Sequence, residues 1–401
     1  MRTVMGGFLL YGALFTDRLA PLFLADRIGR QFGVDVSMLG LLPLAIAVGW
    51  TLGLAAGRLS GRWLSLRQRL WVGGAITAIA GIASAFAPTY VVFLAVRLLG
   101  GIGANITSPA LIALVVRATP SHRRGAALGM LQSSTRIVGS FLAPIVLTAV
   151  VAARGWQPAL VVAAATIAVV LLPVMALVPR RIGPAGVSPR SRAPVYHEHG
   201  PRLLAVATGT AILTFLWLVL ISQAGVPLLE TWLELDVAAA GRLLAWFGVG
   251  STVAAVLVPS WSDRSRATAL VVSSLASAVS GTVLGLAALT GVQPPWLLVG
   301  VVLAVAGVGL GGLPLAISVI PADAVADGDV DRAVEVPIIG AELIGGALLP
   351  AIAFALVPRL GFAPLLLAAA AAFVVLAVVG GATLARVGRL TPRARRGSAP
   401  S

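Results

Sequence analysis

Long apolar stretches separated by short polar segments make up most of the chain. A transmembrane helix needs about twenty mostly apolar residues to cross a hydrocarbon core about 30 Å thick. Twelve stretches meet this criterion, and they cover approximately residues 6–25, 36–57, 70–87, 90–116, 125–151, 158–178, 203–229, 238–258, 268–290, 296–320, 334–357 and 362–384. The pattern predicts an all-α membrane protein with twelve transmembrane helices.

The arginines between the apolar stretches predict how the chain is oriented. Cytoplasmic loops of membrane proteins carry an excess of Lys and Arg. When both chain ends are placed in the cytoplasm, the inward segments hold 21 of the 29 basic residues and the outward segments hold five. We therefore expect a multi-pass protein of the cell membrane, in a bacterium the inner (plasma) membrane, with both ends inside (N-in, C-in).

The two halves of the chain repeat each other. Residues 136–144 read RIVGSFLAP, and 206 residues later residues 342–350 read ELIGGALLP. Such internal repeats are common in transporters built from two bundles. We expect two pseudo-symmetric six-helix bundles (6+6) around a central cavity. The expected parts are an N-terminal bundle (1–178), a cytoplasmic linker rich in Pro and Arg (179–201), a C-terminal bundle (202–386) and a basic cytoplasmic tail (387–401).

Composition excludes several classes of function. With 59% hydrophobic and 11% charged residues, the chain cannot form the surface of an ordinary soluble protein. It contains no lysine and no cysteine, which excludes a P-loop of the GK type, a lysine Schiff base and a thiolate metal site. The net charge of +15 lies in short loops, so nucleic acid is not an expected partner. We expect no enzyme, no metal and no cofactor.

Five ionisable residues lie deep inside the predicted spans. A charge at the centre of a bilayer costs about 2.5–3.5 kcal/mol on insertion scales, so it faces protein or a wet cavity rather than lipid. The third, sixth, ninth and twelfth spans contain no such residue, which places these helices outside, against lipid. The other helices then enclose the charged residues, which are Asp17, Arg18, Arg97, Arg136 and Glu342.

The balance of these charges predicts an anionic ligand. Three arginines face two carboxylates, which leaves one positive charge in excess. Arginine stays protonated and its planar fork matches a carboxylate, so Arg18, Arg97 and Arg136 are candidate substrate-binding residues. The alternative is that these arginines pack helices together or pair with Asp17 and Glu342.

Polar groups in the same spans are candidates for proton coupling and for hydrogen bonds to a substrate. A charged ligand near a buried carboxyl group changes its protonation, which makes Asp17 the first proton-carrier candidate and Glu342 the second. Neighbours on a helix point about 100° apart, so Asp17 and Arg18 are not expected to pair with each other. Asn105 and Gln132 are candidate hydrogen-bond donors to the substrate, with helix–helix contacts as the alternative.

The segment after the second span resembles the inner-loop signature GxLaDRxGRR of the major facilitator superfamily. Residues 57–62 read GRLSGR, with Gly61 where the signature has its aspartate, and the second half of the chain keeps an Asp-Arg dipeptide in register. In this superfamily the signature helps to latch the inner gate. The resemblance therefore implies gating roles for Gly57, Arg58, Arg62, Asp263 and Arg264.

Two further motifs resemble those of the anion:cation symporters, which carry organic acids with protons. Their first helix has a pattern like NYxDR, matched here by Asp17 and Arg18. Their fourth helix reads like RxxxGxGEGxxxP, which Arg97, Gly101, Gly103 and Pro109 match. The glutamate of that motif is associated with proton coupling in the family, and Ala104 takes its place here.

These observations predict a secondary active transporter that moves a small organic anion of the carboxylate type by alternating access, coupled to protons. Its expected partners are the substrate, protons and the lipid bilayer, and we expect a monomer. A proton-driven exporter of drugs or metabolites is the alternative, although the GPxxGG pattern typical of antiporters is missing around Pro144. A non-transporting membrane sensor is a more distant alternative.

Overall fold

The computed structural model describes residues 2–61, 63–120, 124–178, 197–325 and 330–390. This part of the chain is helical, as predicted for an apolar environment in which the backbone must satisfy its own hydrogen bonds. Short polar caps begin several helices, for example Ser65, whose side chain accepts a hydrogen bond from the backbone of Gln68. Asp236 caps another helix in the same way.

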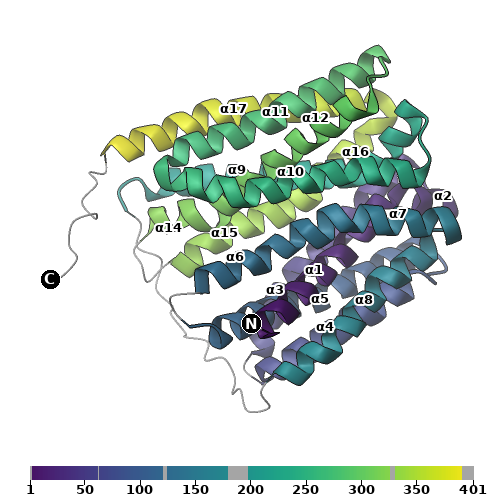
Figure 1. Cartoon of the computed structure of the whole chain (residues 1–401), viewed down its shortest axis with the longest axis horizontal. Helices are drawn as coiled ribbons and strands as arrows, with labels where there is room; N and C mark the ends of the chain where they lie inside the picture. Colours follow the sequence, from purple (N-terminus) through teal and green to yellow (C-terminus); the bar gives the residue numbers. More distant parts are fainter. Residues whose placement is uncertain (1, 62, 121–123, 179–196, 326–329, 391–401) are drawn as a thin grey trace.

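The first half of the chain folds into one group of helices (Figure 1). They are α1 (Arg2–Phe23), α2 (Ala25–Phe32), η1 (Val36–Gly40), α3 (Leu41–Ser60), α4 (Leu66–Ser84), α5 (Tyr90–Ala118), α6 (Arg124–Ser134), η3 (Thr135–Leu142), α7 (Ala143–Arg154) and α8 (Trp156–Leu177). Helices α6, η3 and α7 follow one another without a break and together fill the predicted fifth span.

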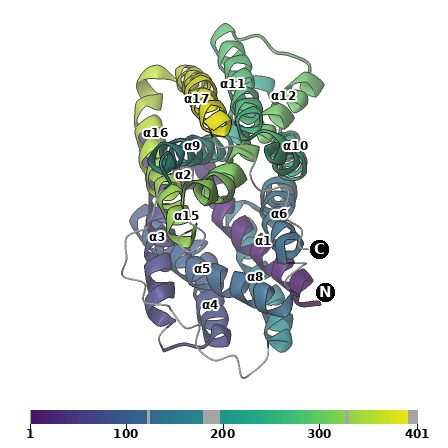
Figure 2. The ribbon, with the colours of Figure 1, turned by 90° about the vertical axis from the view of Figure 1, so that its left-hand side faces the viewer.

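The second half forms a second group beside the first (Figures 1 and 2). It contains α9 (Gly200–Leu233), α10 (Val237–Arg264), α11 (Arg266–Thr290), α12 (Trp296–Val308), η4 (Gly309–Gly311), α13 (Gly312–Pro314), η5 (Leu315–Val319), α14 (Ile320–Ala324), α15 (Val330–Gly340), η6 (Ala341–Leu348), α16 (Leu349–Leu360) and α17 (Phe362–Leu390). Most of the predicted linker and tail lies outside the described residues, and α9 begins two residues before the predicted boundary at 202.

The prediction of twelve transmembrane helices is confirmed in part. Ten helices of the described chain are long and apolar enough to cross a membrane, or eleven if α1 and α2, bent by 55° relative to each other, form one span. The predicted stretch 70–87 corresponds to α4, which is not among them. Its first turn contains Arg67, Gln68 and Arg69, which lower its hydropathy.

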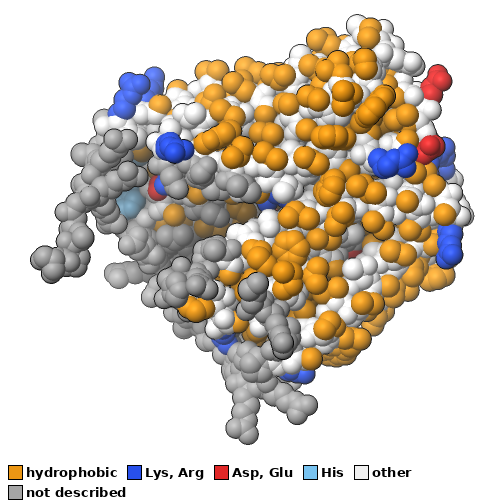
Figure 3. All heavy atoms as spheres, viewed as in Figure 1, with side chains coloured by type: hydrophobic (Ala, Val, Ile, Leu, Met, Phe, Trp, Pro, Cys, Tyr) orange, Lys and Arg blue, Asp and Glu red, His pale blue; other side chains and the backbone are white. Residues whose placement is uncertain are grey.

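The predicted third, sixth, ninth and twelfth spans lie toward the edges of the molecule. Helix α11 packs along α17 at one edge, and α4 packs against α5 and α8 at the other (Figure 2). Apolar side chains such as Val279, Leu286, Val375 and Val378 are exposed on the first pair. In Figure 3 hydrophobic side chains cover the middle of the visible face, while charged side chains gather at its two ends. A surface of this kind suits contact with lipid.

The two groups of helices meet closely. Helix α10 packs on η3 and α7, η6 packs on α3, and α16 packs on η1. A Cβ atom added to Gly248 of α10 would lie 2.4 Å from the backbone of Phe141, and one added to Gly40 would lie 2.8 Å from the Cα atom of Ala351. Glycine is therefore required where the backbones of the two groups touch.

Candidate functional site

An ion pair at the centre of the molecule joins the two groups of helices. Arg18, in the last third of α1, donates from its two terminal nitrogens to the two carboxylate oxygens of Glu342 on η6, at 2.9 and 2.5 Å. Only 7% of Arg18 and 8% of Glu342 are exposed. The guanidinium carbon lies 4.2 Å from the centre of the Trp50 ring and 5.2 Å from that of Phe215. The pair is thus bidentate, buried and covered by aromatic rings, which strengthens it.

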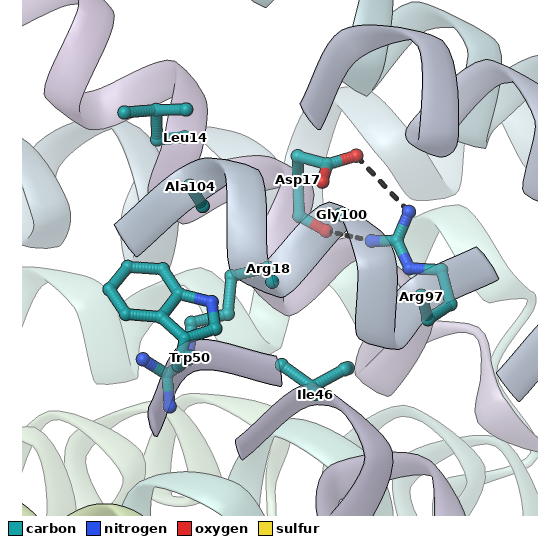
Figure 4. A pocket seen from close by; sticks show the side chains of 9 residues that line it. Leu14, Asp17, Arg18, Ile46, Trp50, Arg97, Gly100 and Ala104 are labelled. Atoms are coloured by element: carbon teal, nitrogen blue, oxygen red, sulfur yellow. Dashed lines mark hydrogen bonds and ion pairs between the residues drawn. The ribbon is translucent and has the colours of Figure 1, made fainter. Parts of the chain in front are cut away.

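A second buried ion pair lies within the first group of helices. Arg97 on α5 donates to a carboxylate oxygen of Asp17 at 3.2 Å, and its other terminal nitrogen donates to the backbone carbonyl of Asp17 (Figure 4). Ser84 accepts a further hydrogen bond from Arg97 at 3.4 Å. Asp17 and Arg18 are neighbours in sequence but bind different partners, as predicted from the angle between adjacent helical residues.

A small cavity separates these two pairs. It has a volume of about 10 Å³, room for about one water molecule, and its lining includes Asp17, Arg18, Trp50 and Ala104 (Figure 4). Ala104, which stands in place of the symporter signature's glutamate, therefore lies beside both ion pairs. A carboxylate here would have bordered Asp17 and Arg18 together.

Arg136 differs from Arg18 and Arg97 because it has no ion-pair partner in the part of the chain that the structure describes. It lies on η3, is 8% exposed, and hydrogen-bonds or ion-pairs with none of the described residues. Tyr11 lies on α1 two turns before Arg18, so the two residues share one side of that helix. Tyr11 interacts electrostatically with Arg136, Arg18 and Glu342. The site therefore gathers these four side chains around the boundary between the helix groups.

The repeat found in the sequence is also a repeat in backbone geometry. Arg136 is the second residue of a π-helical segment, Thr135–Leu142. Glu342 is the second residue of another, Ala341–Leu348, so the two segments are again 206 residues apart and equally long. π-Helical turns are rare and frequent at functional sites. An unpaired cation and a paired carboxylate thus occupy equivalent positions in the two halves.

The charges of the site leave one positive charge without a counter-charge. Asp17 balances Arg97, and Glu342 balances Arg18. The excess predicted from the sequence is therefore carried by Arg136. A buried charge without a partner is costly, so this arrangement favours an anion that supplies the missing negative charge.

The remaining predicted substrate residues lie in different surroundings. Asn105 donates from its side-chain amide to the backbone carbonyl of Trp50 at 2.7 Å, which links α5 to α3. Gln132 is exposed on α6, one turn before Arg136, and lies beside Tyr11. Asn105 and Arg97 therefore hold helices together, whereas Gln132 is exposed beside Tyr11.

Two further ion pairs join the helix groups, above and below the site. We call the end at which α1 begins and α17 ends the inner end, following the predicted orientation (Figure 1). At the outer end Arg27 of α2 donates to both oxygens of Glu230 on α9, at 3.0 and 2.6 Å. At the inner end Arg58 of α3 pairs with Glu335 of α15. Both pairs, like the central one, combine an arginine of the first group with a glutamate of the second.

The predicted gating residues are only partly visible. Arg62 lies outside the described residues, as does the side chain of Asp263, and Arg264 is exposed at the end of α10. Gly57 accepts a long hydrogen bond of 3.4 Å from Arg69 through its backbone carbonyl. Of the signature, only Arg58 makes a described ion pair with the second helix group.

Sequence reasoning missed several residues of this arrangement. Tyr11, Trp50 and Phe215 were not singled out, because aromatic residues in apolar helices usually serve packing. Glu335 had a usable signal, because it precedes Glu342 by seven residues and therefore shares its side of a helix. Glu230 had none, because its role depends on how α2 bends toward α9.

An all-helical membrane protein with paired and unpaired charges buried between two helix groups has the build of a solute carrier. The sequence profile of the Major Facilitator Superfamily matches residues 3–235. The chain belongs to this superfamily of transporters, and it is not an enzyme, as predicted.

Two relatives are similar over part of the chain. "Probable sulfoacetate transporter SauU" of Cupriavidus necator is 29% identical over 158 residues, which cover 38% of this chain and 36% of the relative. "Uncharacterized MFS-type transporter Rv1250" of Mycobacterium tuberculosis is 29% identical over 131 residues, 33% of this chain and 21% of the relative. The matches thus span only about a third and a fifth of the relatives' lengths.

Solved transporter structures share the fold over nearly the whole chain. A POT family transporter in complex with 5-aminolevulinic acid has a TM-score of 0.79 at 12% identity and covers 96% of both chains. A D-xylose-proton symporter has a TM-score of 0.76 at 16% identity, with 94% of this chain and 95% of that one covered. At such identities the likeness establishes the fold alone.

Proposed function

We propose that this protein carries a small organic anion of the carboxylate type across the membrane, coupled to protons. The observation that carries the proposal is Arg136, a buried guanidinium without a counter-charge. A carboxylate would neutralise it and accept the paired hydrogen bonds that an arginine fork offers. Arg18, close by and partly covered by Trp50, is the second arginine that the substrate would meet.

The relative named for sulfoacetate supports an anion rather than a neutral or cationic solute. Sulfoacetate carries a carboxylate and a sulfonate, and both groups match arginine. The match covers 38% of this chain, so it supports the class of substrate and not its identity. A proton-driven exporter of drugs or metabolites remains the alternative, and such a protein would accept cationic or neutral compounds.

Coupling to protons is assigned to Asp17, with Glu342 as the second group. Asp17 is 4% exposed and pairs with Arg97, so both burial and this one arginine act on its charge state. Ala104 cannot replace the missing glutamate. This leaves Asp17, which lines the cavity, and Glu342, which pairs with Arg18 of the lining.

The three ion pairs that join the helix groups among the described residues support alternating access. Opening outward would separate Arg27 from Glu230, and opening inward would separate Arg58 from Glu335. We assign the rocking units to residues 1–178 and 202–386, in a monomer with both ends in the cytoplasm.

Transport by the purified protein in proteoliposomes tests the proposal. We expect saturable uptake and counterflow of malonate or sulfoacetate, stimulated by an inward proton gradient. Arg136→Met should lose uptake, whereas Arg154→Ala, at an exposed position on α7, should keep it. Uptake that ignores the gradient, or that Asp17→Asn leaves unchanged, would refute the coupling, and selective transport of cations would favour the exporter.

A further inference from the structure

Glu342 occupies the end of the Arg18 guanidinium group. Both terminal nitrogens of Arg18 donate to its carboxylate, at 2.9 and 2.5 Å, while Trp50 and Phe215 lie over the guanidinium group. An incoming carboxylate that binds this end of the guanidinium group would need the same two donors. A substrate anion and Glu342 therefore cannot hold Arg18 in this way at the same time.

We propose that Glu342 is an internal substitute for the substrate's carboxylate, and that the substrate displaces it from Arg18. This inference rests on the proposed transport of an organic anion. In the empty carrier Glu342 keeps a buried arginine neutralised. In the loaded carrier the substrate takes over that task.

The charges around the site permit this exchange. Arg18, Arg136 and Glu342 are all buried, Arg18 pairs with Glu342, and the segment η3 that carries Arg136 packs on α1. Together the three residues carry one excess positive charge. When a carboxylate enters, two arginines face two carboxylates, and no charge remains unbalanced. Once the substrate's carboxylate has taken Arg18, the charge of Glu342 balances that of Arg136, which hydrogen-bonds with none of the described residues.

The exchange also changes how the helix groups are held together. Glu342 belongs to η6 and Arg18 to α1, so their pair crosses the boundary at the centre of the molecule. A substrate that takes Arg18 removes this link and leaves the outer and inner pairs to decide which end opens. A ligand shifts a conformational equilibrium only by such a difference between states.

Binding of malonate and acetate to the purified full chain, measured by calorimetry, tests the inference. Glu342→Gln leaves Arg18 without its competitor, so we expect this variant to bind the anion at least about tenfold more tightly than the unmodified protein. A residue that merely stabilises the site would give weaker binding. Arg18→Met should abolish binding in both backgrounds.

A glutamate outside the three ion pairs provides a matched control. Glu234 is exposed at the end of α9, so Glu234→Gln should leave affinity unchanged. Glu342→Asp keeps the charge but shortens the side chain, so it should increase the affinity for the anion by a smaller factor. This variant tests the inference if Glu342→Gln does not fold. If the unmodified protein binds the anion and the Glu342 variants bind it equally well or more weakly, this inference is wrong but the proposed function stands. If no organic anion binds or is transported by any form, the proposed function fails as well.

Discussion

Buried arginines with and without a partner should respond to substitution with opposite changes in stability. Arg136 and Arg97 are both buried, at 8% and 4% exposure, but only Arg97 has a carboxylate partner. Methionine keeps the apolar stem of arginine and removes its charge. The two substitutions thus differ mainly in one respect: Arg97→Met leaves the carboxylate of Asp17 without its cation, whereas Arg136→Met leaves no carboxylate unpaired.

The expected magnitudes follow from the cost of burying polar groups. Arg136→Met removes an unpaired cation whose Nε atom has no partner, and should stabilise the empty protein by about 1–3 kcal/mol. Arg97→Met leaves Asp17 buried without its cation and should destabilise the protein by about 3–5 kcal/mol. Arg136→Met should also transport the anion more slowly. The rate should fall about tenfold or more for each charged hydrogen bond that the substrate loses.

Thermal unfolding in detergent and uptake into proteoliposomes measure the two effects. The reasoning requires Arg136→Met to unfold at a higher temperature than the unmodified protein while it transports less. Arg154→Ala, which changes an exposed arginine, is the control for the loss of a positive charge as such. A lower unfolding temperature for Arg136→Met would mean that the guanidinium has a stabilising partner, and it would refute the assignment of Arg136 as the free anion site.

Two further predictions concern the ion pairs. Glu230→Gln weakens the outer pair with Arg27 and should make the outer end open more often. A cysteine introduced at Ala351, which contacts Gly40 at the outer end, reports on this opening. It should react about tenfold faster with an impermeant maleimide in the Glu230→Gln background. The chain has no cysteine of its own, and equal rates would contradict an outer gate. Asp17→Asn and Arg97→Met should each lower the free energy of unfolding, measured by thermal unfolding. The double variant should lose about 0.5–3 kcal/mol less stability than the two single losses added together. Additive losses would show that the two residues do not act as a pair.

Much of the fold could be predicted because transmembrane helices are encoded locally. The predicted stretch 90–116 differs from α5 by two residues at one end, and the stretch 36–57 coincides with η1 and α3 to within three residues. The helix α4 was also located correctly, although Arg67 and Arg69 in its first turn keep it from meeting the apolar criterion. Hydropathy reports whether a segment prefers the membrane or water, and this preference does not depend on the rest of the chain.

The members of the site could be predicted, but their roles could not. Burial in apolar spans singled out Asp17, Arg18, Arg97, Arg136 and Glu342, because a charge in such a place needs a special environment. Which arginine remains free depends on distances between helices. From sequence alone, Arg97 and Arg136 were equal candidates for an anion.

The sequence by itself determined the membrane class, the positions of the helices, the internal repeat and the excess of one positive charge. These follow from hydrophobicity and from counting, which need no contacts between distant residues. Only the tertiary structure decided that Arg18 pairs with Glu342, 324 residues away, that Asp17 pairs with Arg97, and that Arg136 is left alone. Pairing depends on where packed helices bring side chains to within a few ångströms, and the linear order of the chain does not contain that distance.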